Sequence, residues 1–235
     1  MTAQEILKEI KPLGSESYKK VIFTHGVTEP CYGVKIGDLQ KIQKRIKQDY
    51  QLALDLYDTG VYDAMYLAGL IADDALMTRK DLQRWVTTAT CNPICRWTVA
   101  WVTAGSPHGW ELGLEWIDSK NPPVATAGWA TLGSLVSIKE DSALDQAELK
   151  RLLQRVQKTI HQAPDAVRVQ MNAFIIAVGT YVAPLTETAK KTAREIGEIT
   201  ADQGDNACKL PFAPDAIEKV AKRGSIGKKR KTAKC

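Results

Sequence analysis

Three features of the sequence predict an all-α fold. Apolar residues recur at three- and four-residue spacing in almost every segment. Short connections rich in Gly, Pro, Asn and Asp separate these segments, and no stretch alternates convincingly between apolar and polar residues. Roughly a dozen helices joined in this way, with a period of about 40 residues, fit stacked antiparallel pairs. We therefore expect an α-solenoid of HEAT-like helix pairs, with a compact irregular helical domain as the alternative fold.

The N-terminal half carries the clearest helix signals. Thr2 and Glu5 form a capping box, which predicts that the first helix begins just after Thr2. Residues 36–46 place their isoleucines and leucine on one face and their lysines and arginine on the other, as an amphipathic helix does. Further helices are expected over residues 15–24, 52–57, 62–71, 82–86 and 94–102.

The C-terminal half continues the same pattern. Residues 124–129 are weakly ambiguous, but their small side chains suit close helix packing better than a strand. Helices are expected over residues 111–117, 124–138, 149–160, 167–182, 184–199 and 215–221. We expect one helical-repeat domain over residues 1–223 and a basic tail over residues 224–235.

The positive charge of the chain is concentrated at its C-terminal end. Residues 219–235 hold eight Lys or Arg and no Asp or Glu, so the net charge of +5 leaves −3 for residues 1–218. Burying an ammonium group costs several kcal/mol, so the run is expected to stay in water or lie against a polyanion such as nucleic acid. Gly224 and Gly227 lack the spacing of a phosphate loop and are interpreted as a flexible hinge. A solvated tail and a nuclear localisation signal remain the alternatives.

All the tryptophans fall within a span of 45 residues in the middle of the chain. Trp97 and Trp101 are four residues apart and share a helix face, with Arg96 beside them. Two indoles and a guanidinium can contact a sugar-phosphate backbone or a displaced base, whereas core packing is the competing interpretation. For Trp116 and Trp129 we expect core packing.

The remaining residue types argue against a metal site, a membrane span and an obvious nucleophile. Five cysteines are spread along the chain, and the Cys91–Cys95 pair has Pro93 between its members and no histidine at ligand spacing, so no metal or other cofactor is expected. No apolar run approaches the ~18 residues of a membrane helix, and the N-terminus does not resemble a signal peptide. We expect a cytoplasmic monomer that contacts no membrane, with nucleoid association left open.

Three segments, in this order, resemble a known family. They are Gly33-Val-Lys-Ile-Gly-Asp-Leu-Gln-Lys-Ile, Leu114-Glu-Trp-Ile-Asp-Ser-Lys-Asn and Gln170-Met-Asn-Ala-Phe-Ile-Ile. With the helix pairs, the tryptophans and the basic end, they resemble the AlkD-type DNA alkylation repair family over roughly residue 33 to the end. The resemblance implies a C-shaped solenoid that grips duplex DNA in its concave face. It also implies that enzymatic members hydrolyse the N-glycosidic bond of alkylated purines.

This chain departs from the motifs that the resemblance implies for catalysis. Enzymatic members use a Trp-x-x-x-Asp carboxylate, whereas the matching run here is Trp97-Thr-Val-Ala-Trp101. No Asp or Glu occurs from residue 82 to residue 110, so a shift of register does not restore the carboxylate. The later helix also lacks the family's arginine in residues 177–180. A neutral indole cannot stabilise an oxocarbenium ion as a carboxylate does.

The leading hypothesis is therefore a DNA-binding repeat protein of this family, for duplex, damaged or branched DNA, that lacks the catalytic carboxylate. The residues expected to contact DNA are Arg96, Trp97, Trp101, Arg168, Lys228, Lys229, Arg230 and Lys231. The first alternative is an active glycosylase with another carboxylate, of which Asp118 is the nearest candidate. The second alternative is a protein–protein scaffold that uses the tryptophan cluster.

Overall fold

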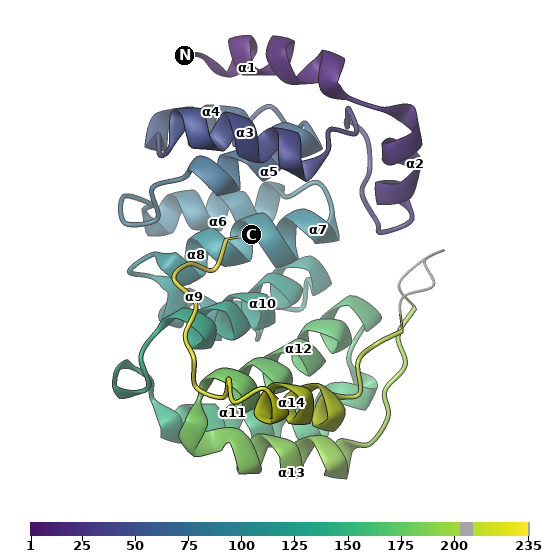
Figure 1. Cartoon of the computed structure of the whole chain (residues 1–235), viewed down its shortest axis with the longest axis vertical. Helices are drawn as coiled ribbons and strands as arrows, with labels where there is room; N and C mark the ends of the chain where they lie inside the picture. The colour runs from purple at the N-terminus through teal and green to yellow at the C-terminus, as the bar shows by residue number, and fades with distance from the viewer. Residues whose placement is uncertain (203–208, 235) are drawn as a thin grey trace.

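The computed structural model describes residues 1–202 and 209–234 (Figure 1). Within these residues the chain is all-α, as the sequence predicts, and an isolated bridge joins Gly14 and Val34. The N-terminal helices are α1 (Ala3–Ile10), α2 (Glu16–Phe23), α3 (Ile36–Ile46), α4 (Tyr50–Tyr57), α5 (Tyr62–Ile71), α6 (Arg79–Thr88), α7 (Asn92–Ile94), the π-helical η2 (Cys95–Val99) and α8 (Ala100–Gly105). The C-terminal helices are α9 (Gly109–Trp116), α10 (Pro122–Ile138), α11 (Gln146–Thr159), α12 (Asp165–Tyr181), α13 (Thr186–Ile196) and α14 (Ala213–Lys222). Single 3-10 turns follow or precede several of them: η1 (Lys11–Leu13), η3 (Asp141–Ala143), η4 (Ile160–Gln162) and η5 (Ala183–Leu185).

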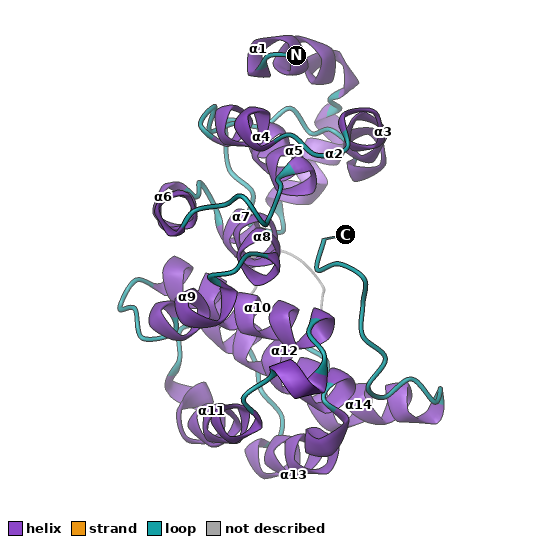
Figure 2. Ribbon diagram, turned by 90° about the vertical axis from the view of Figure 1, so that its left-hand side faces the viewer, coloured by secondary structure: helices purple, strands orange, loops and turns teal. Residues whose placement is uncertain are grey.

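The helices stack as antiparallel pairs. Contacts join α4 to α5, α6 to η2, α9 to α10, α11 to α12 and α13 to α14, and successive second helices pack on one another. Figure 2 shows α5, α8, α10, α12 and α14 on the side that carries the C-terminal segment, with α4, α6, α9 and α11 on the opposite side and α13 at the lower end of the stack. The stack bows toward the C-terminal segment, so the second helices form an inner, concave face. This is the α-solenoid that the sequence predicts.

Helix α10 approaches the end of α9 closely because a glycine of α10 faces it. A Cβ atom on Gly128 of α10 would lie 2.7 Å from the backbone nitrogen of Ile117, a distance that real Cβ atoms do not reach. Trp129, next to it, is fully buried against Phe174 of α12, with ring centres 5.2 Å apart. The small side chains of residues 124–129 therefore serve helix packing, as predicted.

One helix that the sequence predicts as regular contains a π-helical turn. The segment expected over residues 94–102 is interrupted at η2, between the short α7 and α8. Hydrogen bonds in such a turn join residues five apart in place of four, so the side chains that follow it point in a different direction around the helix axis. The turn carries Arg96 and Trp97, so the irregularity falls where the sequence places the candidate site.

The longest apolar helices belong to the core. Within the described residues, α12 together with Ala183–Ile196 is the one stretch whose length and hydropathy match a membrane span, but it bends by 115° at the break and no single helix qualifies. The buried side of α12 packs against α10, α13 and α14.

A buried carboxylate ties the N-terminal connection to the stack. Asp63 of α5 is 0% exposed and accepts hydrogen bonds from the backbone nitrogens of Tyr32 (2.6 Å) and Val34 (2.7 Å). These two residues lie in the connection from α2 to α3. The bonds therefore fix the path by which the chain enters the first inner helices.

Replacing Asp63 by alanine should destabilise the protein. Two backbone N–H groups would lose their acceptor at a buried site, at about 1–3 kcal/mol each. Urea unfolding should therefore show a loss of at least about 2 kcal/mol in the free energy of unfolding. Asp55→Ala, at an exposed position of α4, is the matched control and should change it by less than about 0.5 kcal/mol. Equal effects in the two variants would contradict this role for Asp63.

Candidate nucleic-acid interface

Arg96, Trp97 and Trp101 come together on the inner face. The guanidinium carbon of Arg96 lies 4.4 Å from the ring centre of Trp97. The rings of Trp97 and Trp101 stack with centres 6.5 Å apart and planes 20° apart, in keeping with their four-residue spacing. A guanidinium held over an indole by a cation–π contact keeps its charge while its position is fixed.

The two indoles differ in accessibility. Trp101 is 5% exposed and meets the ring of Tyr66 edge-on at 5.6 Å, so it mainly packs inner helices together. Trp97 is half-buried and offers the more accessible ring. The predicted core tryptophans Trp116 and Trp129 are buried.

A groove of about 340 Å³ lies beside these residues, between η2, α8, α10 and α12. Its floor is apolar and aromatic, since it includes Trp129, Phe174 and Ala177. Gln170 and Tyr181 add polar groups, and Arg230 from the C-terminal end reaches its rim. We call this the tryptophan groove. None of the described residues that line it is an Asp or a Glu.

Residues 224–234 form a strap along the inner face, where the sequence is interpreted as a flexible hinge that leads into a basic tail. Figures 1 and 2 both show it running from α14 back toward the middle of the stack. Its backbone nitrogens donate to the carboxyl ends of inner helices, from Gly227 to Thr180 of α12 and from Arg230 to Ser137 of α10, each at 2.8 Å. Ala233 is only 3% exposed. The run of lysines therefore does not stay wholly in water.

Two lysines of the strap are largely covered and paired inside the protein, with 9% and 13% of their side chains exposed. Lys229 places its Nζ 3.0 Å from the carbonyl of Val136 and 2.8 Å from a carboxylate oxygen of Asp141. Lys234 places its Nζ 2.7 Å from the carbonyl of Ala72 and 2.7 Å from Asp74. Both ammonium groups sit at the carboxyl end of an inner helix, where the helix dipole favours a cation. Each ammonium group has a carboxylate and a carbonyl as partners in place of water. These contacts offset the free-energy cost of removing the charge from water.

The Asp74 carboxylate is held tightly as well. A Cβ atom on Gly105 of α8 would lie 2.2 Å from its Oδ2, so the glycine leaves the space that the carboxylate occupies. Burial raises the pKa of Asp74 above its usual value, although Lys234 opposes the shift. The carboxylate is thus desolvated, and it depends on Lys234 for its counter-charge.

The remaining cations of the strap face outward. Lys228, Arg230 and Lys231 are exposed, and Arg230 also donates from Nη2 to the carbonyl of Lys234 at 3.3 Å. Of the four basic residues expected to hold a DNA backbone, Lys229 is therefore committed to the protein and three present their charge to solvent.

Arg168 is also committed to the protein. Its guanidinium donates to Asp165 and to the carbonyls of Ile160, His161, Ala163 and Thr200. These bonds use all five of the N–H groups that an arginine possesses. The side chain therefore ties the start of α12 to its surroundings and has no donor left for the phosphate contact expected from the sequence.

Asp118 lies outside the tryptophan groove. It precedes α10, is 70% exposed, and pairs with Arg155 through a contact of 2.6 Å. Arg155 also lies over the outer side of Trp129, with 5.7 Å from its guanidinium carbon to the ring centre. The carboxylate named as the alternative catalytic group is thus an exposed ion-pair partner.

The cysteines that the structure describes are neutral thiols within the fold. Burial raises the pKa of Cys95 to about 12 and also raises the pKa of Cys91. No group of three or more His, Cys, Asp or Glu in residues 1–202 and 209–234 could hold a metal ion. Cys208 and Cys235 lie outside the described residues.

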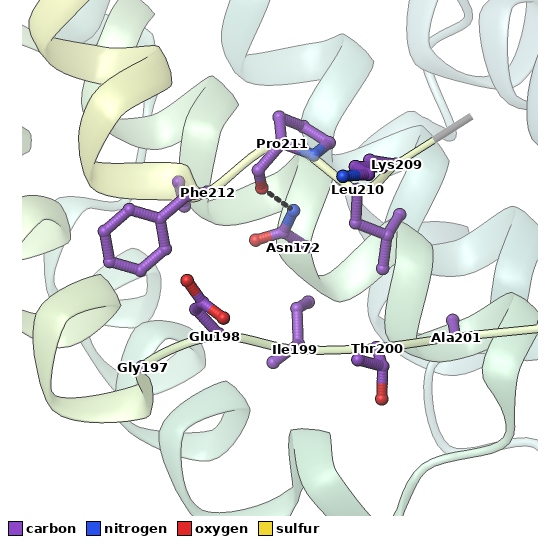
Figure 3. A pocket seen from close by; sticks show the side chains of 11 residues that line it. Asn172, Gly197, Glu198, Ile199, Thr200, Ala201, Lys209, Leu210, Pro211 and Phe212 are labelled. Atoms are coloured by element: carbon purple, nitrogen blue, oxygen red, sulfur yellow. Dashed lines mark hydrogen bonds between the residues drawn. The ribbon is translucent and has the colours of Figure 1, made fainter. Parts of the chain in front are cut away.

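A separate cavity of about 500 Å³ lies between Asn172 of α12, residues 197–201 and residues 209–213 (Figure 3). The side-chain amide of Asn172 donates to the carbonyl of Pro211 at 2.9 Å across it. The cavity has no described residue in common with the tryptophan groove, and its hydrogen bond ties the start of α14 to α12.

Fold and groove together define a helical-repeat protein with an aromatic, cationic inner face. The family model described as DNA alkylation repair enzyme matches residues 6–195, and the chain belongs to this family. This confirms the resemblance seen in the sequence, and the match begins earlier than expected and ends before the strap. HEAT-like repeats are confirmed by a solved structure with a TM-score of 0.92 that is 33% identical and covers 100% of both chains. That structure represents a new family of proteins related to the HEAT-like repeat DNA glycosylases with affinity for branched DNA structures.

Two bacterial relatives resemble the chain over nearly its whole length. They are uncharacterized proteins of Listeria innocua and Listeria monocytogenes. Each is 28% identical over 234 residues, which covers 95% of this chain and 99% of the relative.

Replacing Lys234 by glutamine should loosen the strap. The partly buried Asp74 would lose its counter-charge, so the free energy of unfolding should fall by about 1–3 kcal/mol at neutral pH, and the amide protons of Gly227 and Arg230 should exchange faster. The loss of Lys234 should raise the pKa of Asp74 further above its unfolded value. A carboxyl with a raised folded pKa binds its proton more tightly when folded, so the deficit should shrink as the pH falls through that pKa.

The exposed Lys231→Gln is the matched control for this variant. It removes the same charge from the same strap and should leave stability and amide exchange almost unchanged. The double variant Asp74→Asn/Lys234→Gln should recover part of the loss, because it leaves no unpaired carboxylate. Equal stability of Lys234→Gln and Lys231→Gln would show that the ion pair does not hold the strap.

Proposed function

We propose that this chain binds the phosphate backbone of DNA on its inner face and does not cleave the N-glycosidic bond. The observation that carries the proposal is the placement of Arg96 and Trp97 at the tryptophan groove, which the exposed Arg230 of the strap also lines. Arginines and lysines attract phosphates, and an accessible indole can stack on a base or a sugar. The affinity of the similar solved protein's family for branched DNA structures supports DNA as the ligand.

The composition of the groove supports a loss of glycosylase chemistry. Stabilising an oxocarbenium ion requires a negative charge aimed at the sugar, and removing such a directed group typically costs about 3–4 kcal/mol of barrier. The described lining of the tryptophan groove supplies Trp101 where the family's carboxylate is expected, and no Asp or Glu elsewhere. Asp118 is separated from the groove and already paired with Arg155.

Charge distribution also favours DNA over a protein partner. The positive balance of the chain lies in its last seventeen residues, and one of their exposed members, Arg230, lines the tryptophan groove. An apolar, uncharged patch would suit a scaffold better, because protein interfaces are depleted of lysine at their centres. A scaffold remains the outcome if DNA binding is absent.

DNA binding should depend strongly on salt and on the exposed cations of the strap. Replacing Lys228, Arg230 and Lys231 by glutamine removes three proposed phosphate contacts, so the slope of log affinity against log salt should become shallower by about 2.7. Fluorescence anisotropy with a labelled duplex and a labelled four-way junction measures this slope. We prefer these substitutions to deletion of residues 224–235, because the strap also packs on α10 and α12.

The matched control replaces three exposed cations away from the inner face, Lys8, Lys20 and Lys150, by glutamine. It changes the net charge equally and should preserve the slope. Equal slopes for the strap variant and the wild-type protein would remove the strap from the interface. No binding of either DNA by the wild-type protein at 50–100 mM salt would contradict the proposed function.

Base release should be absent. Incubation of the protein with DNA that carries methylated purines should liberate no more free base than buffer does, because the described groove has no carboxylate to stabilise the sugar cation. Chromatography of the released bases measures this. Release above background that disappears in Asp118→Asn would instead support the active-glycosylase alternative.

A further inference from the structure

A second cleft lies on the inner face at the other end of the strap. It has a volume of about 640 Å³ and is bounded by the last turn of α3, the connection to α4, and the strap residues Thr232 and Lys234. Figures 1 and 2 both show the chain's end at the level of α8. Lys44 and Lys47 stand on the α3 side of the cleft. Neither is part of the tryptophan groove.

The cleft carries positive charge that the described part of the protein does not neutralise. Lys44 and Lys47 are exposed, and no ion pair joins either to a described acidic side chain. The neighbouring cations of α3 differ, because Lys41 pairs with Asp38 and Arg45 pairs with Glu9.

The acidic residue in the cleft does not cancel this charge. Asp74 lines the cleft and is already matched by Lys234 at 2.7 Å. Two positive charges from α3 therefore remain without a described counter-charge. The glutamines at positions 40, 43 and 48 complete the wall with amide groups that can donate to phosphate oxygens.

The strap connects the two sites and limits the distance between them. Arg230 lies at the tryptophan groove, and Lys234 lies in the second cleft. Four residues of extended chain span at most about 14 Å. That distance is close to the width of the major groove of B-DNA, about 12 Å, so neighbouring backbone segments of one nucleic acid can reach both sites.

We propose that the second cleft is a further phosphate-backbone site for the same nucleic acid, with Lys44 and Lys47 as its cations. The inference rests on the proposed DNA binding. A simpler role for the two lysines is to stabilise the carboxyl end of α3 through its dipole. The helix-dipole role explains where the two lysines lie, but it predicts that DNA binding does not depend on them. A phosphate site predicts that DNA binding does depend on them, so an experiment can separate the two interpretations.

The test replaces Lys44 and Lys47 by glutamine and measures binding to a labelled four-way DNA junction over a range of salt. Two lost phosphate contacts should make the slope of log affinity against log salt shallower by about 1.8 and weaken binding about 30-fold at 150 mM salt. Glutamine keeps the length of the side chain, and at Lys47, where φ is +68°, it adds no branching at the β carbon. Thermal unfolding of the variant checks that the fold is retained.

The matched control is Lys20→Gln with Lys41→Gln, which removes the same charge from α2 and α3 outside the cleft. Its slope should equal that of the wild-type protein. Equal slopes for the two double variants would overturn the second site, and a lower stability of the Lys44/Lys47 variant with an unchanged slope would assign these lysines to the helix dipole. Failure of the wild-type protein to bind the junction or the duplex would instead overturn the proposed function, and this inference with it.

Discussion

The shape of the inner face depends on the ion pairs that two lysines of the strap, Lys229 and Lys234, form with Asp141 and Asp74. Lys229 and Lys234 are among the least exposed lysines of the chain, with 9% and 13% of their side chains accessible. Each pairs with a carboxylate and with a carbonyl at the end of an inner helix. Such pairs contribute modestly to net stability, but breaking one leaves a desolvated charge without a partner. The constraint is therefore positional, since it sets where the strap lies and which of its cations remain outside.

This constraint divides the basic residues of the strap into two groups, those that pair with the protein and those that remain exposed. The buried lysines alternate with exposed residues, so Lys228, Arg230 and Lys231 are presented along a segment that cannot swing freely in solution. Ordering a charged segment before a ligand arrives removes part of the entropy cost of binding. A wholly disordered tail of the same composition would attract DNA from further away but would not define the edge of a groove. The strap therefore combines an electrostatic role with a structural one.

Much of the fold could be predicted from the sequence, because amphipathic periodicity and short connections are local signals. The capping box at Thr2 is present, with the Thr2 nitrogen 2.8 Å from Glu5, and the small residues before Trp129 do pack α10 closely. The π-helical turn at η2 was not predictable, because its hydrogen-bond pattern depends on neighbouring helices and leaves the apolar spacing intact.

The candidate site could be predicted only in part. The cluster of Arg96, Trp97 and Trp101 follows from a four-residue spacing, and the sequence alone shows that residues 82–110 contain no Asp or Glu. The position of the strap cannot be predicted from the sequence, because the hydrogen bond from Lys234 to Ala72 joins residues that are 162 positions apart. No local pattern marks Asp74 or Asp141 as counter-charges. The same limit applies to Arg168, whose partners include a carbonyl 32 residues away.

In the proposed function, the lack of an acidic side chain in the described lining of the tryptophan groove and the cationic strap fit together physically. A glycosylase must bring a negative group to the sugar while the same surface attracts a polyanion, so the two electrostatic demands oppose each other. Here the described lining of the tryptophan groove has no acidic side chain, and the acidic residues near the strap are already matched by Lys229 and Lys234. The described lining of the groove therefore attracts a polyanion and places no unpaired carboxylate against it. Under the proposed function, such a surface would hold a DNA backbone through charge and aromatic contact, and its selectivity would come from the arrangement of backbones that it touches at once.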